Sequence, residues 1–524
     1  MKILLVNPPI TLHRLDVSPR CKFPLVGLGY VAAALSAAGH GIKILNCIPT
    51  SSCLSAVNRD FTRFGITDER IFSEIQTFNP DIVGISCMFT SNFRDAHNVA
   101  RIAKEHKKDT LVIFGGTHSS VFYGEVIKDV NVDLVVVGEG EITICEVTER
   151  FKNKSGFDGV KGIVHRVDGK VVIEQPRPLI DNLDNMPFPA WDMMTEDIAE
   201  FELTNRKNKF LMRKPVCHII TSRGCPNECY FCSVKLICGR KWRARSAKNV
   251  VDEIEFLKNK YGFAEFHFDD DNCSVSKRRM HDICDEILNR RLKIKLATPT
   301  GIAIAGLDRD VLVKMKKAGF YRLCFGIETG NQESQAIIRK RIRLNNAKKI
   351  ISVANKLGYW TAATFIFGFP HETEVQIRDT IEFAKQTGMD FAIFYLLTPQ
   401  PKTEAYNILK QQGLIDLDAF LDPHSQEWYK ISISYSNGFR TSHFSNFQLQ
   451  QLLASAYKEF LIHKLLSPYT YLNLVRKIHN LEDLFYLVNL ATIPFQMLIR
   501  SFLGFRLCNN SLWGRFIELK DTGA

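Results

Sequence analysis

Three cysteines lie close together in the middle of the chain, in the segment TSRGCPNECYFCSV. They are Cys225, Cys229 and Cys232, and Phe231 stands directly before the last of them. Structural zinc sites use four protein ligands, usually in two separated pairs, and iron–sulfur clusters are also held by cysteine thiolates, commonly four. Three thiolates would bind three irons of a [4Fe–4S] cluster and leave the fourth iron open. The spacing therefore predicts a reactive site and not a structural metal centre.

Two other arrangements of these cysteines are considered. In the first, a zinc knuckle is completed by Cys217 or Cys238, and in the second the three cysteines are buried and structural. The CxxxCxxC spacing does not match the separated ligand pairs of zinc sites, which favours the cluster.

The triplet, with an aromatic residue before its last cysteine, resembles the signature of the radical S-adenosylmethionine (radical SAM) superfamily. In that family the open iron binds the amino and carboxylate groups of SAM, and SAM is cleaved to a 5′-deoxyadenosyl radical that abstracts hydrogen from a substrate. The resemblance implies that Cys225, Cys229 and Cys232 ligate a [4Fe–4S] cluster. It also implies that the chain is an enzyme.

The composition is that of a large globular protein. A length of 524 residues predicts about three domains, and 45% hydrophobic with 24% charged residues provides for sizeable cores. The fourteen cysteines are scattered, and the start, MKILLVNPP, lacks the longer apolar core and cleavage site of a secretory signal. We therefore expect reduced thiols and a cytoplasmic location.

The formal net charge is +12, with dispersed basic residues. Two local basic groups occur, at residues 240–245 and 339–343, and a solvated surface is the expectation for both. No basic segment is interleaved with aromatic residues as in RNA-binding modules, so no DNA partner is expected and a tRNA substrate is only an alternative. The positive charge is compatible with contact to an anionic membrane surface.

The first 150 residues alternate short apolar strands with helical patterns. The predicted strands are residues 2–7, 42–47, 81–87, 111–116 and 133–140, and the predicted helices include residues 25–38 and 92–106. Continuous apolar strands separated by helices predict a parallel sheet with helices on both faces. Ligands of such sheets bind at the carboxyl ends of the strands. We therefore expect a Rossmann-like ligand-binding domain.

Polar and glycine residues mark the ends of these strands. They are Asn7, Ser86, Gly116, Thr117, His118, Gly138 and Glu139. Glycine there lets the backbone approach a large flat ligand closely. The strings NPP (7–9), GGTH (115–118) and GEGE (138–141), with the segment 23–35, resemble the cobalamin-binding domain that precedes one large radical SAM subfamily. The resemblance implies that these residues contact cobalamin.

The chain departs from many cobalamin proteins in one respect. Those proteins carry a DxHxxG motif whose histidine binds cobalt, and the nearest string here, at 95–100, lacks the final glycine and lies in a predicted helix. We therefore assign no histidine ligand. Either cobalamin binds without a protein imidazole, or the domain is degenerate and has lost cobalamin.

Residues 151–195 are predicted to be a separate excursion and linker. KGIVHRV and KVVIEQP flank Asp168-Gly169, which predicts a β-hairpin, and residues 181–194 resemble the connector of the same subfamily. The predicted domains are thus a cobalamin-binding domain (1–150), hairpin and linker (151–195), radical SAM barrel (196–405) and helical C-terminal region (406–524).

Strand–helix pairs repeat from about Ile219 onward. Further predicted strands are residues 264–272, 294–300, 322–330, 361–370 and 391–399, and the predicted helices are residues 246–260, 276–290, 308–318, 346–357 and 373–387. Six strands are too few for an eightfold barrel, and a partial (βα)6 barrel is the fold that the resemblance implies. The fold class is therefore α/β, with a mostly helical C-terminal region.

Functional side chains of such a barrel lie at the carboxyl ends of its strands. Asp270, Asp271 and Asn272 match the subfamily's FxDDN-type string, with Cys273 in place of its final phenylalanine. The resemblance implies that they hold the ammonium group or ribose of SAM. The alternative is that they cap the following helix.

Two later motifs complete the predicted SAM site. Glu328, in GIETGNQ, matches a motif beside the SAM ribose and methionine, and Gly368, in FIFGFPHET, matches one near the adenine. The alternatives are a structural ion pair for Glu328 and a tight turn for Gly368. Cys273 and Cys324 are expected to be buried and not redox-active.

The C-terminal region is predicted to contain helices near 447–465 and 481–504. The run 484–499 has no charges but spans only sixteen residues, with Asn489 and Pro494 inside. A transmembrane helix needs about twenty apolar residues, so a buried or interfacial helix is expected. Residues 467–478 resemble the subfamily's tail, which packs over the substrate opening.

The first functional hypothesis is a cobalamin-dependent radical SAM enzyme that transfers a methyl group to an unactivated carbon. The alternatives are a radical SAM enzyme catalysing cyclisation, oxidation or rearrangement, and a non-catalytic sensor of cobalamin or of a cluster. A sensor has no use for an open iron. The expected partners are a small-molecule substrate, for which the tail helices suit an apolar compound, and an electron donor such as flavodoxin or ferredoxin. No catalytic side chain is assigned.

Overall fold

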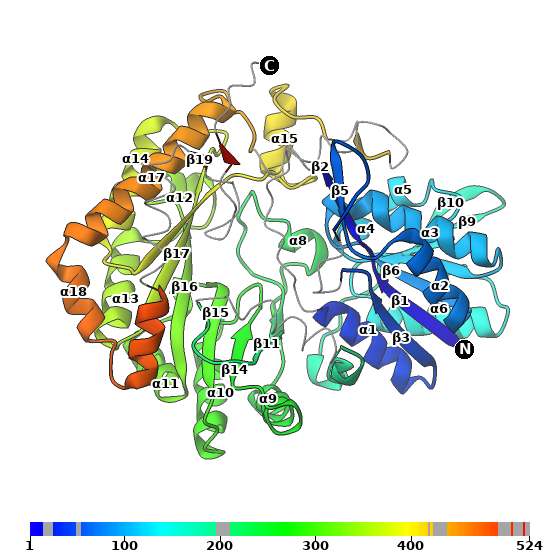
Figure 1. The fold of residues 1–524 in the computed structure, drawn as a ribbon, viewed down its shortest axis with the longest axis horizontal. Helices are drawn as coiled ribbons and strands as arrows, with labels where there is room; N and C mark the ends of the chain where they lie inside the picture. The colour runs from blue at the N-terminus through cyan, green and yellow to red at the C-terminus, as the bar shows by residue number, and fades with distance from the viewer. Residues whose placement is uncertain are drawn as a thin grey trace.

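The computed structural model of the protein describes residues 1–13, 25–48, 54–194, 210–417, 420–422, 438–490, 505–506 and 517–518. Figure 1 shows two α/β units side by side, the first in blue and cyan and the second in green and yellow, with the C-terminal helices in orange along the outer side of the second. The predicted fold class is confirmed.

A seven-stranded sheet forms the first unit, in the order β10-β9-β8-β7-β6-β1-β3. Its parallel strands are β1 (Lys2–Asn7), β3 (Gly41–Asn46), β6 (Ile82–Ser86), β7 (Leu111–Gly115) and β8 (Leu134–Val136). The helices α1 (Val26–Ala37) and α6 (Glu141–Lys152) share a core on one face, and α2 (Asp68–Phe78) and α3 (Phe93–His106) pack on the other. The apolar strands are buried on both faces, as their continuous apolar sequences predict.

The predicted hairpin is part of this sheet and not a separate excursion. β9 (Ile163–Val167) pairs antiparallel with β10 (Lys170–Ile173) and also with β8. Asp168 and Gly169 form its turn, both with positive φ. The sequence predicts the hairpin but not its partner, because pairing between distant strands leaves no local signal. A small sheet of β2 (Ile10–His13), β5 (Phe61–Phe64) and β4 (Leu54–Ala56) is also not predicted.

The second unit is a parallel six-stranded sheet in the order β11-β14-β15-β16-β17-β18. The strands are β11 (Val216–Ile219), β14 (Glu265–Phe268), β15 (Lys295–Ile302), β16 (Phe320–Glu328), β17 (Trp360–Phe367) and β18 (Phe391–Leu396). The helices between them are α9 (Ala247–Tyr261), α10 (Lys277–Asn289), α11 (Arg309–Lys317), α12 (Gln332–Ile337), α13 (Leu344–Lys356) and α14 (Glu374–Gln386). Of these, only the short α12 is absent from the sequence prediction, and the one-turn helix α8 (Val234–Ile237), between β11 and β14, is not predicted either. The six-stranded partial barrel is confirmed.

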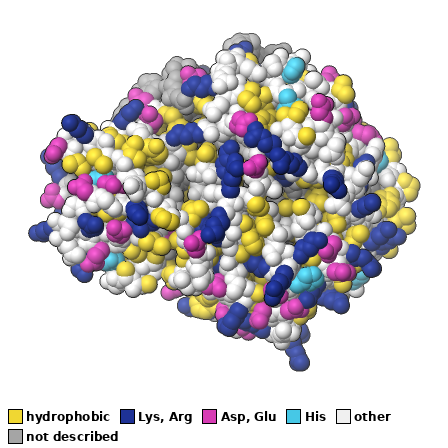
Figure 2. Space-filling view, turned by 180° about the vertical axis from the view of Figure 1, so that it is seen from behind, with side chains coloured by type: hydrophobic (Ala, Val, Ile, Leu, Met, Phe, Trp, Pro, Cys, Tyr) yellow, Lys and Arg dark blue, Asp and Glu magenta, His cyan; other side chains and the backbone are white. Residues whose placement is uncertain are grey.

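The two units share a core. Val26 and Tyr30 of α1 belong to the buried cluster of the barrel, together with Trp191 of the linker. Trp191 Nε1 donates a hydrogen bond to Glu253 of α9 at 2.9 Å. Figure 2 shows Lys and Arg side chains spread over the rear face and interspersed with Asp and Glu, as the dispersed charges of the sequence predict.

The C-terminal region contains α15 (Glu404–Gln411), α17 (Asn446–Leu466) and α18 (Pro468–Val475), and residues 481–490 are also helical. The prediction of a helix near 447–465 is confirmed. Residues 491–504 of the other predicted helix, and residues 23–24 of the segment 23–35, lie outside the described residues. None of the helices in the described parts of the chain has the length and apolar character that crossing a bilayer requires.

A buried ion pair fastens the C-terminal helices to the barrel. Lys477, directly after α18, bonds to the Asp390 carboxylate, and the two side chains are 0% and 6% exposed. Asp390 also accepts hydrogen bonds from the amide and hydroxyl of Thr361, the second residue of β17. The pair therefore ties the tail to the start of two strands.

We predict that Lys477→Met destabilises the protein by about 3–5 kcal/mol, because removing one partner leaves the Asp390 charge buried and uncompensated. The midpoint of thermal unfolding measures this loss. The matched control is Lys458→Met, at an exposed position on α17, and should leave the midpoint unchanged. Equal effects in both variants would contradict the prediction.

Candidate active site

A short antiparallel ribbon carries the cysteine loop. β12 (Ser222–Arg223) pairs with β13 (Arg243–Ala244), so residues 224–242 form a loop closed at its base, and this loop contains the one-turn helix α8 (Val234–Ile237). Gly224 opens the loop with a φ of +81°, and a Cβ there would lie 2.6 Å from the carbonyl oxygen of Lys241. Only glycine fits this turn without displacing backbone.

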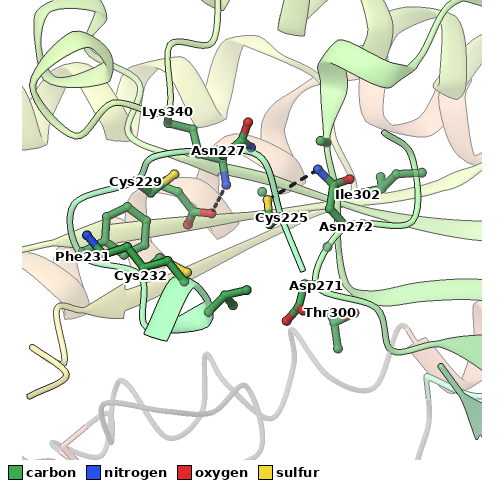
Figure 3. A pocket seen from close by; sticks show the side chains of 16 residues that line it. Cys225, Asn227, Cys229, Phe231, Cys232, Asp271, Asn272, Thr300, Ile302 and Lys340 are labelled. Atoms are coloured by element: carbon green, nitrogen blue, oxygen red, sulfur yellow. Dashed lines mark hydrogen bonds and ion pairs between the residues drawn. The ribbon is translucent and has the colours of Figure 1, made fainter. Parts of the chain in front are cut away.

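The three predicted cysteines line one pocket of about 200 Å³. The pocket lies at the carboxyl ends of β14, β15 and β16, and Figure 3 shows the three sulfur atoms arranged around a common space. Among the described residues no fourth cysteine lines it, and the zinc-knuckle candidates Cys217 and Cys238 are not at its wall. The pocket therefore offers three thiols from one loop.

Two of the polar residues after β14 reach this pocket. Asp271 and Asn272 both line it, and Asn272 Nδ2 lies 3.8 Å from the sulfur of Cys225 (Figure 3). Asp271 accepts a hydrogen bond from the Gly224 amide at 2.9 Å, which holds the start of the cysteine loop.

Asp270 lies behind the pocket wall. One carboxylate oxygen accepts the Thr221 amide at 2.6 Å, and the other accepts the hydroxyls of Thr221 and Ser222. It is 3% exposed, and it is not among the residues that line the pocket. Asp270 therefore connects the end of β14 to the strand ahead of the cysteine loop.

Glu328 and Lys340 form a charged pair in the pocket wall. Glu328 ends β16 with a φ of +70°, in the left-handed region that few non-glycine residues adopt. The pairing register of β16 with β17 shifts at this point, and such bulges re-aim side chains. The Glu328 carboxylate accepts hydrogen bonds from Lys340 Nζ at 2.8 Å and from the Thr364 hydroxyl at 3.2 Å.

The expectation of a solvated surface for residues 339–343 is wrong for Lys340, whose side chain is 15% exposed. Burial disfavours its ammonium form, but the Glu328 carboxylate beside it raises the pKa of Lys340 above its ordinary value. The neighbouring Arg341 is 70% exposed, so composition alone does not distinguish the two.

The same expectation for residues 240–245 is wrong for Arg243 and Arg245. Their side chains are 1% and 4% exposed, and both are paired with buried carboxylates. A run of basic residues on a ribbon points alternately to its two faces, so some members of the run face the interior.

Further pocket residues carry no signal in the sequence. Thr300, Gly301, Ile302 and Ala303, at the end of β15, line the pocket with Asn227 of the cysteine loop. None of them is ionisable, and the sequence prediction ends the strand at residue 300. Their position at a strand's carboxyl end is the only indication that could have identified them.

The turn after β17 supports the cysteine loop. Gly368, with a φ of +88°, donates its amide to the Glu372 carboxylate at 2.7 Å, and the Phe369 amide donates to the same oxygen at 3.3 Å. The ring of Phe369 lies 5.4 Å from that of Phe231 and 6.0 Å from that of Tyr230, both in the cysteine loop. Gly368 itself does not line the pocket.

Burial keeps two of the pocket thiols protonated in the absence of a metal. Burial raises the pKa of the Cys229 thiol to about 11, and it also raises the pKa of Cys232. The Lys340 ammonium acts in the opposite direction on both thiols. Because thiolate is the form that ligates metals, a metal bound here displaces protons from these thiols.

The carboxyl edge of the first sheet brings together four of the residues predicted to contact cobalamin. Asn7, Ser86, Gly116 and Gly138 lie at the ends of β1, β6, β7 and β8, which are neighbours in the sheet. The short helix α4 (Thr117–Val121) begins at this edge, with Thr117 as its first residue, and packs near α8 of the cysteine loop. The edge therefore faces the loop that carries the three thiols.

His118 lies inside the first unit. It is 4% exposed, Nδ1 is 3.1 Å from the Thr90 hydroxyl, and its ring packs against Phe93 and Phe122. Burial lowers the pKa of His118 to about 3, so the ring is neutral. His97, from the string at 95–100, is also buried and is bonded to Asp129 at 2.7 Å, consistent with assigning no histidine to cobalt.

Comparison with known proteins identifies the family. The model of the B12 binding domain matches residues 18–148, and that of the radical SAM superfamily matches residues 219–384. A cytidylyl-2-hydroxyethylphosphonate methyltransferase of Streptomyces wedmorensis is 32% identical over 79% of this chain and 83% of its own length. The chain belongs to the cobalamin-dependent radical SAM methyltransferase family.

Other members support this placement. An uncharacterized methyltransferase of Pyrococcus horikoshii is 31% identical over 88% of this chain and 92% of its own length. The solved structure of the cobalamin-dependent S-adenosylmethionine radical enzyme OxsB covers 96% of this chain and 72% of that chain, with a TM-score of 0.65 and 16% identity, so the two share a fold. Family membership confirms the predicted enzyme class and the cofactor set of [4Fe–4S] cluster, SAM and cobalamin.

Both sites of this family member fit these cofactors. The barrel pocket supplies three thiols and a buried cation, which suit an anionic cluster. At the sheet edge, Met88 and Phe89 follow Cys87 after the end of β6 and are 44% and 58% exposed, although both are apolar. Exposed apolar side chains at a ligand-binding edge are typical of a surface that a large ligand covers. Met88 and Phe89 carry no signal in the sequence, because isolated apolar residues are common.

Glu372 predicts a specific dependence of stability on pH. It is fully buried, its Oε1 has no partner among the described residues, and burial raises its pKa from 4.5 to about 8. Between these two pH values the unfolded chain releases a proton that the folded protein retains. Stability is therefore greatest below pH 4.5 for this group, and is lost as the pH rises toward 8.

We predict that Glu372→Gln removes this loss. The variant's stability relative to the native chain should rise by about 1.4 kcal/mol per pH unit across the window and be constant outside it. Thermal unfolding measured over that pH range tests this, with Glu374→Gln, 60% exposed on α14, as the matched control. A difference that does not change with pH would refute the assignment.

Proposed function

We propose that this chain transfers a methyl group to a carbon atom of a small molecule by radical chemistry at the pocket below the cysteine loop. The observation that carries the proposal is the meeting of three thiols with the charged pair of Glu328 and Lys340 in one pocket, which Asp271 and Lys235 also line. A non-catalytic sensor is disfavoured, because a sensor requires neither an incomplete ligand set nor a charged pair beside it.

In this proposal Cys225, Cys229 and Cys232 hold the [4Fe–4S] cluster through their thiolates. Glu328 and Lys340 present one negative and one positive group, which are complementary to the ammonium and carboxylate of an amino acid such as the methionine part of SAM. Asp271 and Asn272 add polar groups at the same wall. Asp270 and Gly368 act indirectly. Asp270 holds the strand ahead of the cysteine loop, and Gly368 forms the turn after β17 that supports this loop.

When bound, the cluster and SAM supply the radical that removes a hydrogen atom, and cobalamin supplies the methyl group. The chain's own contribution is orientation and exclusion of water. Glu328 is held by Lys340 and Thr364 before any ligand arrives, so its direction is fixed in advance. The aromatic contacts of Phe231 and Tyr230 with Phe369 hold the cysteine loop against the barrel.

Asn7, Ser86, Gly116, Thr117 and Gly138 are proposed to form the cobalamin edge. Their position supports this proposal, because they lie at the carboxyl ends of neighbouring parallel strands, where ligands of such sheets bind. His118 and Glu139 are proposed to support this edge from behind, since both side chains are engaged within the protein.

The remaining partners and the location are also proposals. An acidic electron-transfer protein such as flavodoxin or ferredoxin suits a chain with a net charge of +12. A reducing, cytoplasmic environment is supported by the cysteines of the described residues, all of which are free thiols.

We predict that anaerobic reconstitution with iron, sulfide and hydroxocobalamin loads about four irons and one cobalamin per chain. Replacing Cys225, Cys229 and Cys232 with alanine should abolish iron binding and SAM cleavage but retain cobalamin, because the two sites lie in different units. Iron analysis, ultraviolet–visible spectra and the yield of 5′-deoxyadenosine measure these outcomes.

Cys238→Ala is the matched control, because Cys238 lies in the same loop but not at the pocket wall. Loss of iron in this variant would show that Cys238 is a fourth ligand and would contradict the open-iron assignment. Once a substrate is identified, the mass of the product distinguishes the reactions. A gain of one methyl group supports methyl transfer, whereas an unchanged number of methyl groups supports cyclisation, oxidation or rearrangement. Turnover by the variant that lacks all three cysteines would contradict the proposal.

We further propose that the C-terminal helices contact an anionic membrane surface. Large apolar side chains are exposed there at Ile462, Leu465, Leu466, Tyr469, Tyr471, Leu472, Val475, Leu481, Leu484, Phe485 and Val488. Two acidic residues lie within this segment. Glu482 is bonded to Arg213, and Asp483 is buried. From residue 484 to 517 the sequence contains arginines but no acid. Apolar and cationic composition without exposed acids is typical of helices that lie on membranes.

We predict that the protein cosediments with vesicles of phosphatidylcholine and phosphatidylglycerol, and that replacing Leu472, Val475 and Phe485 with serine weakens binding about ten-fold or more. The matched control replaces Val130 and Ile173, exposed apolar residues of the first unit, with serine. Absence of binding by the native protein, or a dimer that the same variant dissociates, would contradict the proposal.

A further inference from the structure

The base of the cysteine loop carries two arginines that face each other. Arg223 and Arg243 are register partners in the ribbon of β12 and β13. Like charges directly opposite in an antiparallel pair destabilise it. Their side chains are 13% and 1% exposed, so water screens this repulsion poorly. The ribbon therefore depends on anionic partners from elsewhere in the chain.

Both anionic partners come from the first unit. Both lie in the string GEGE, where Glu139 stands between β8 and α6 and Glu141 is the first residue of α6. Arg243 donates to both oxygens of Glu139 at 2.8 Å, and Arg223 donates to Glu139 at 3.1 Å and to Glu141 at 2.6 Å. Each carboxylate is 9% exposed. Four charges from two units thus neutralise one another at the base of the loop.

The linker between the units joins the same network. Ile180 donates its amide to Glu139 at 2.8 Å and accepts a hydrogen bond from Arg243 through its carbonyl at 2.8 Å. The guanidinium of Arg223 also lies 5.1 Å from the ring centre of Tyr30, in α1. The base of the cysteine loop is therefore bonded to a strand end, a helix and the linker.

This network is not optimised for stability. Glu141 Oε2 and Arg243 Nε are buried without a hydrogen-bond partner among the described residues, and each such group costs free energy. Buried ion pairs contribute little net stability compared with apolar side chains of the same volume. What they supply is direction, because the two terminal nitrogens of Arg223 join two different carboxylates, and Arg243 contacts both oxygens of Glu139 through one nitrogen.

We propose that Arg223, Arg243, Glu139 and Glu141, here called the stem lock, are positioning residues that fix the cysteine loop relative to the carboxyl edge of the first sheet. The inference rests on the proposed function, in which the two cofactors bound at these places must face each other. Glu139 then acts through the arginines and does not touch cobalamin. The lock explains why both carboxylates of GEGE are buried beside the ribbon.

Hydrogen–deuterium exchange on the full chain, without cofactors, tests the lock directly. Glu139→Gln keeps the shape of the side chain but removes its charge, and should speed exchange in residues 222–244 about ten-fold. Exchange in β15–β18 should be unchanged. Lys477→Met is the matched control, since it breaks a buried ion pair outside the lock. Unchanged exchange in 222–244, or an equal rise in the control, would overturn the proposal.

A double variant separates positioning from stability. The double variant Glu139→Gln, Arg243→Met removes both charges of the Glu139–Arg243 pair and leaves neither partner unpaired. It should therefore recover most of the thermal stability that Glu139→Gln loses. Hydrogen exchange in residues 222–244 should nevertheless stay fast. Glu139→Asp, which keeps the charge, should restore slow exchange at least in part. If exchange in the double variant returns to the native rate together with stability, the lock has only a structural role.

The loaded enzyme provides a second readout. Pulsed electron paramagnetic resonance between the reduced cluster and cob(II)alamin should give one narrow distance distribution in the native protein and a broad one in Glu139→Gln. A narrow distribution in both would overturn the proposal. If the native chain binds neither cofactor, the proposed function fails, and the exchange experiment still decides whether the lock exists.

Discussion

A loop that must hold three thiols in fixed relative positions cannot do so with its own backbone. Residues 224–242 contain one turn of helix and are closed only by a ribbon of two residue pairs. Their geometry therefore depends on charges outside the loop. Asp271 holds the Gly224 amide from the barrel side, and Glu139 and Glu141 neutralise the ribbon's arginines from the other. The remaining architecture serves to bring these carboxylates to the two sides of one loop.

Most of the fold follows from the sequence, because its elements are local. Strands such as Ile82–Ser86 are continuous apolar runs, and the helix Ala247–Tyr261 begins where Ser246 caps it and ends at Gly262 in the left-handed conformation. Two features do not follow. The pairings of β9 with β8 and of β2 with β5 join segments distant in sequence, and the polar hairpin carries no mark of its partner. Non-local pairing is decided by packing and not by pattern.

The residues of the site show the same difference between local and non-local signals. The three cysteines, Asp271 and Glu328 line one pocket; the spacing singles out the cysteines in the sequence, and the resemblance to family motifs singles out Asp271 and Glu328. Lys340 and Arg243 were not predictable, because each lies in a basic run that also contains exposed members, such as Arg341 at 70% and Lys241 at 68%. Asp270 shows the reverse case: its type suits a ligand contact, but burial and three donors make it a brace. Whether a charged residue faces a cofactor or a neighbouring strand is set by tertiary contacts that one sequence does not encode locally.

The balance of charge in the pocket explains why the cysteine loop and the barrel can assemble before any cofactor is present. If the three thiols were ionised, their charges and those of Glu328 and Asp271 would outnumber the two ammonium groups, Lys235 and Lys340, among the described residues that line the pocket. Burial instead keeps the Cys229 and Cys232 thiols protonated at neutral pH, and Glu328 with Lys340 is then a neutral pair. Metal binding reverses this, since each thiol that becomes a ligand loses its proton. Loading of the cluster should therefore be favoured by rising pH, while the folded pocket itself requires no metal charge to form.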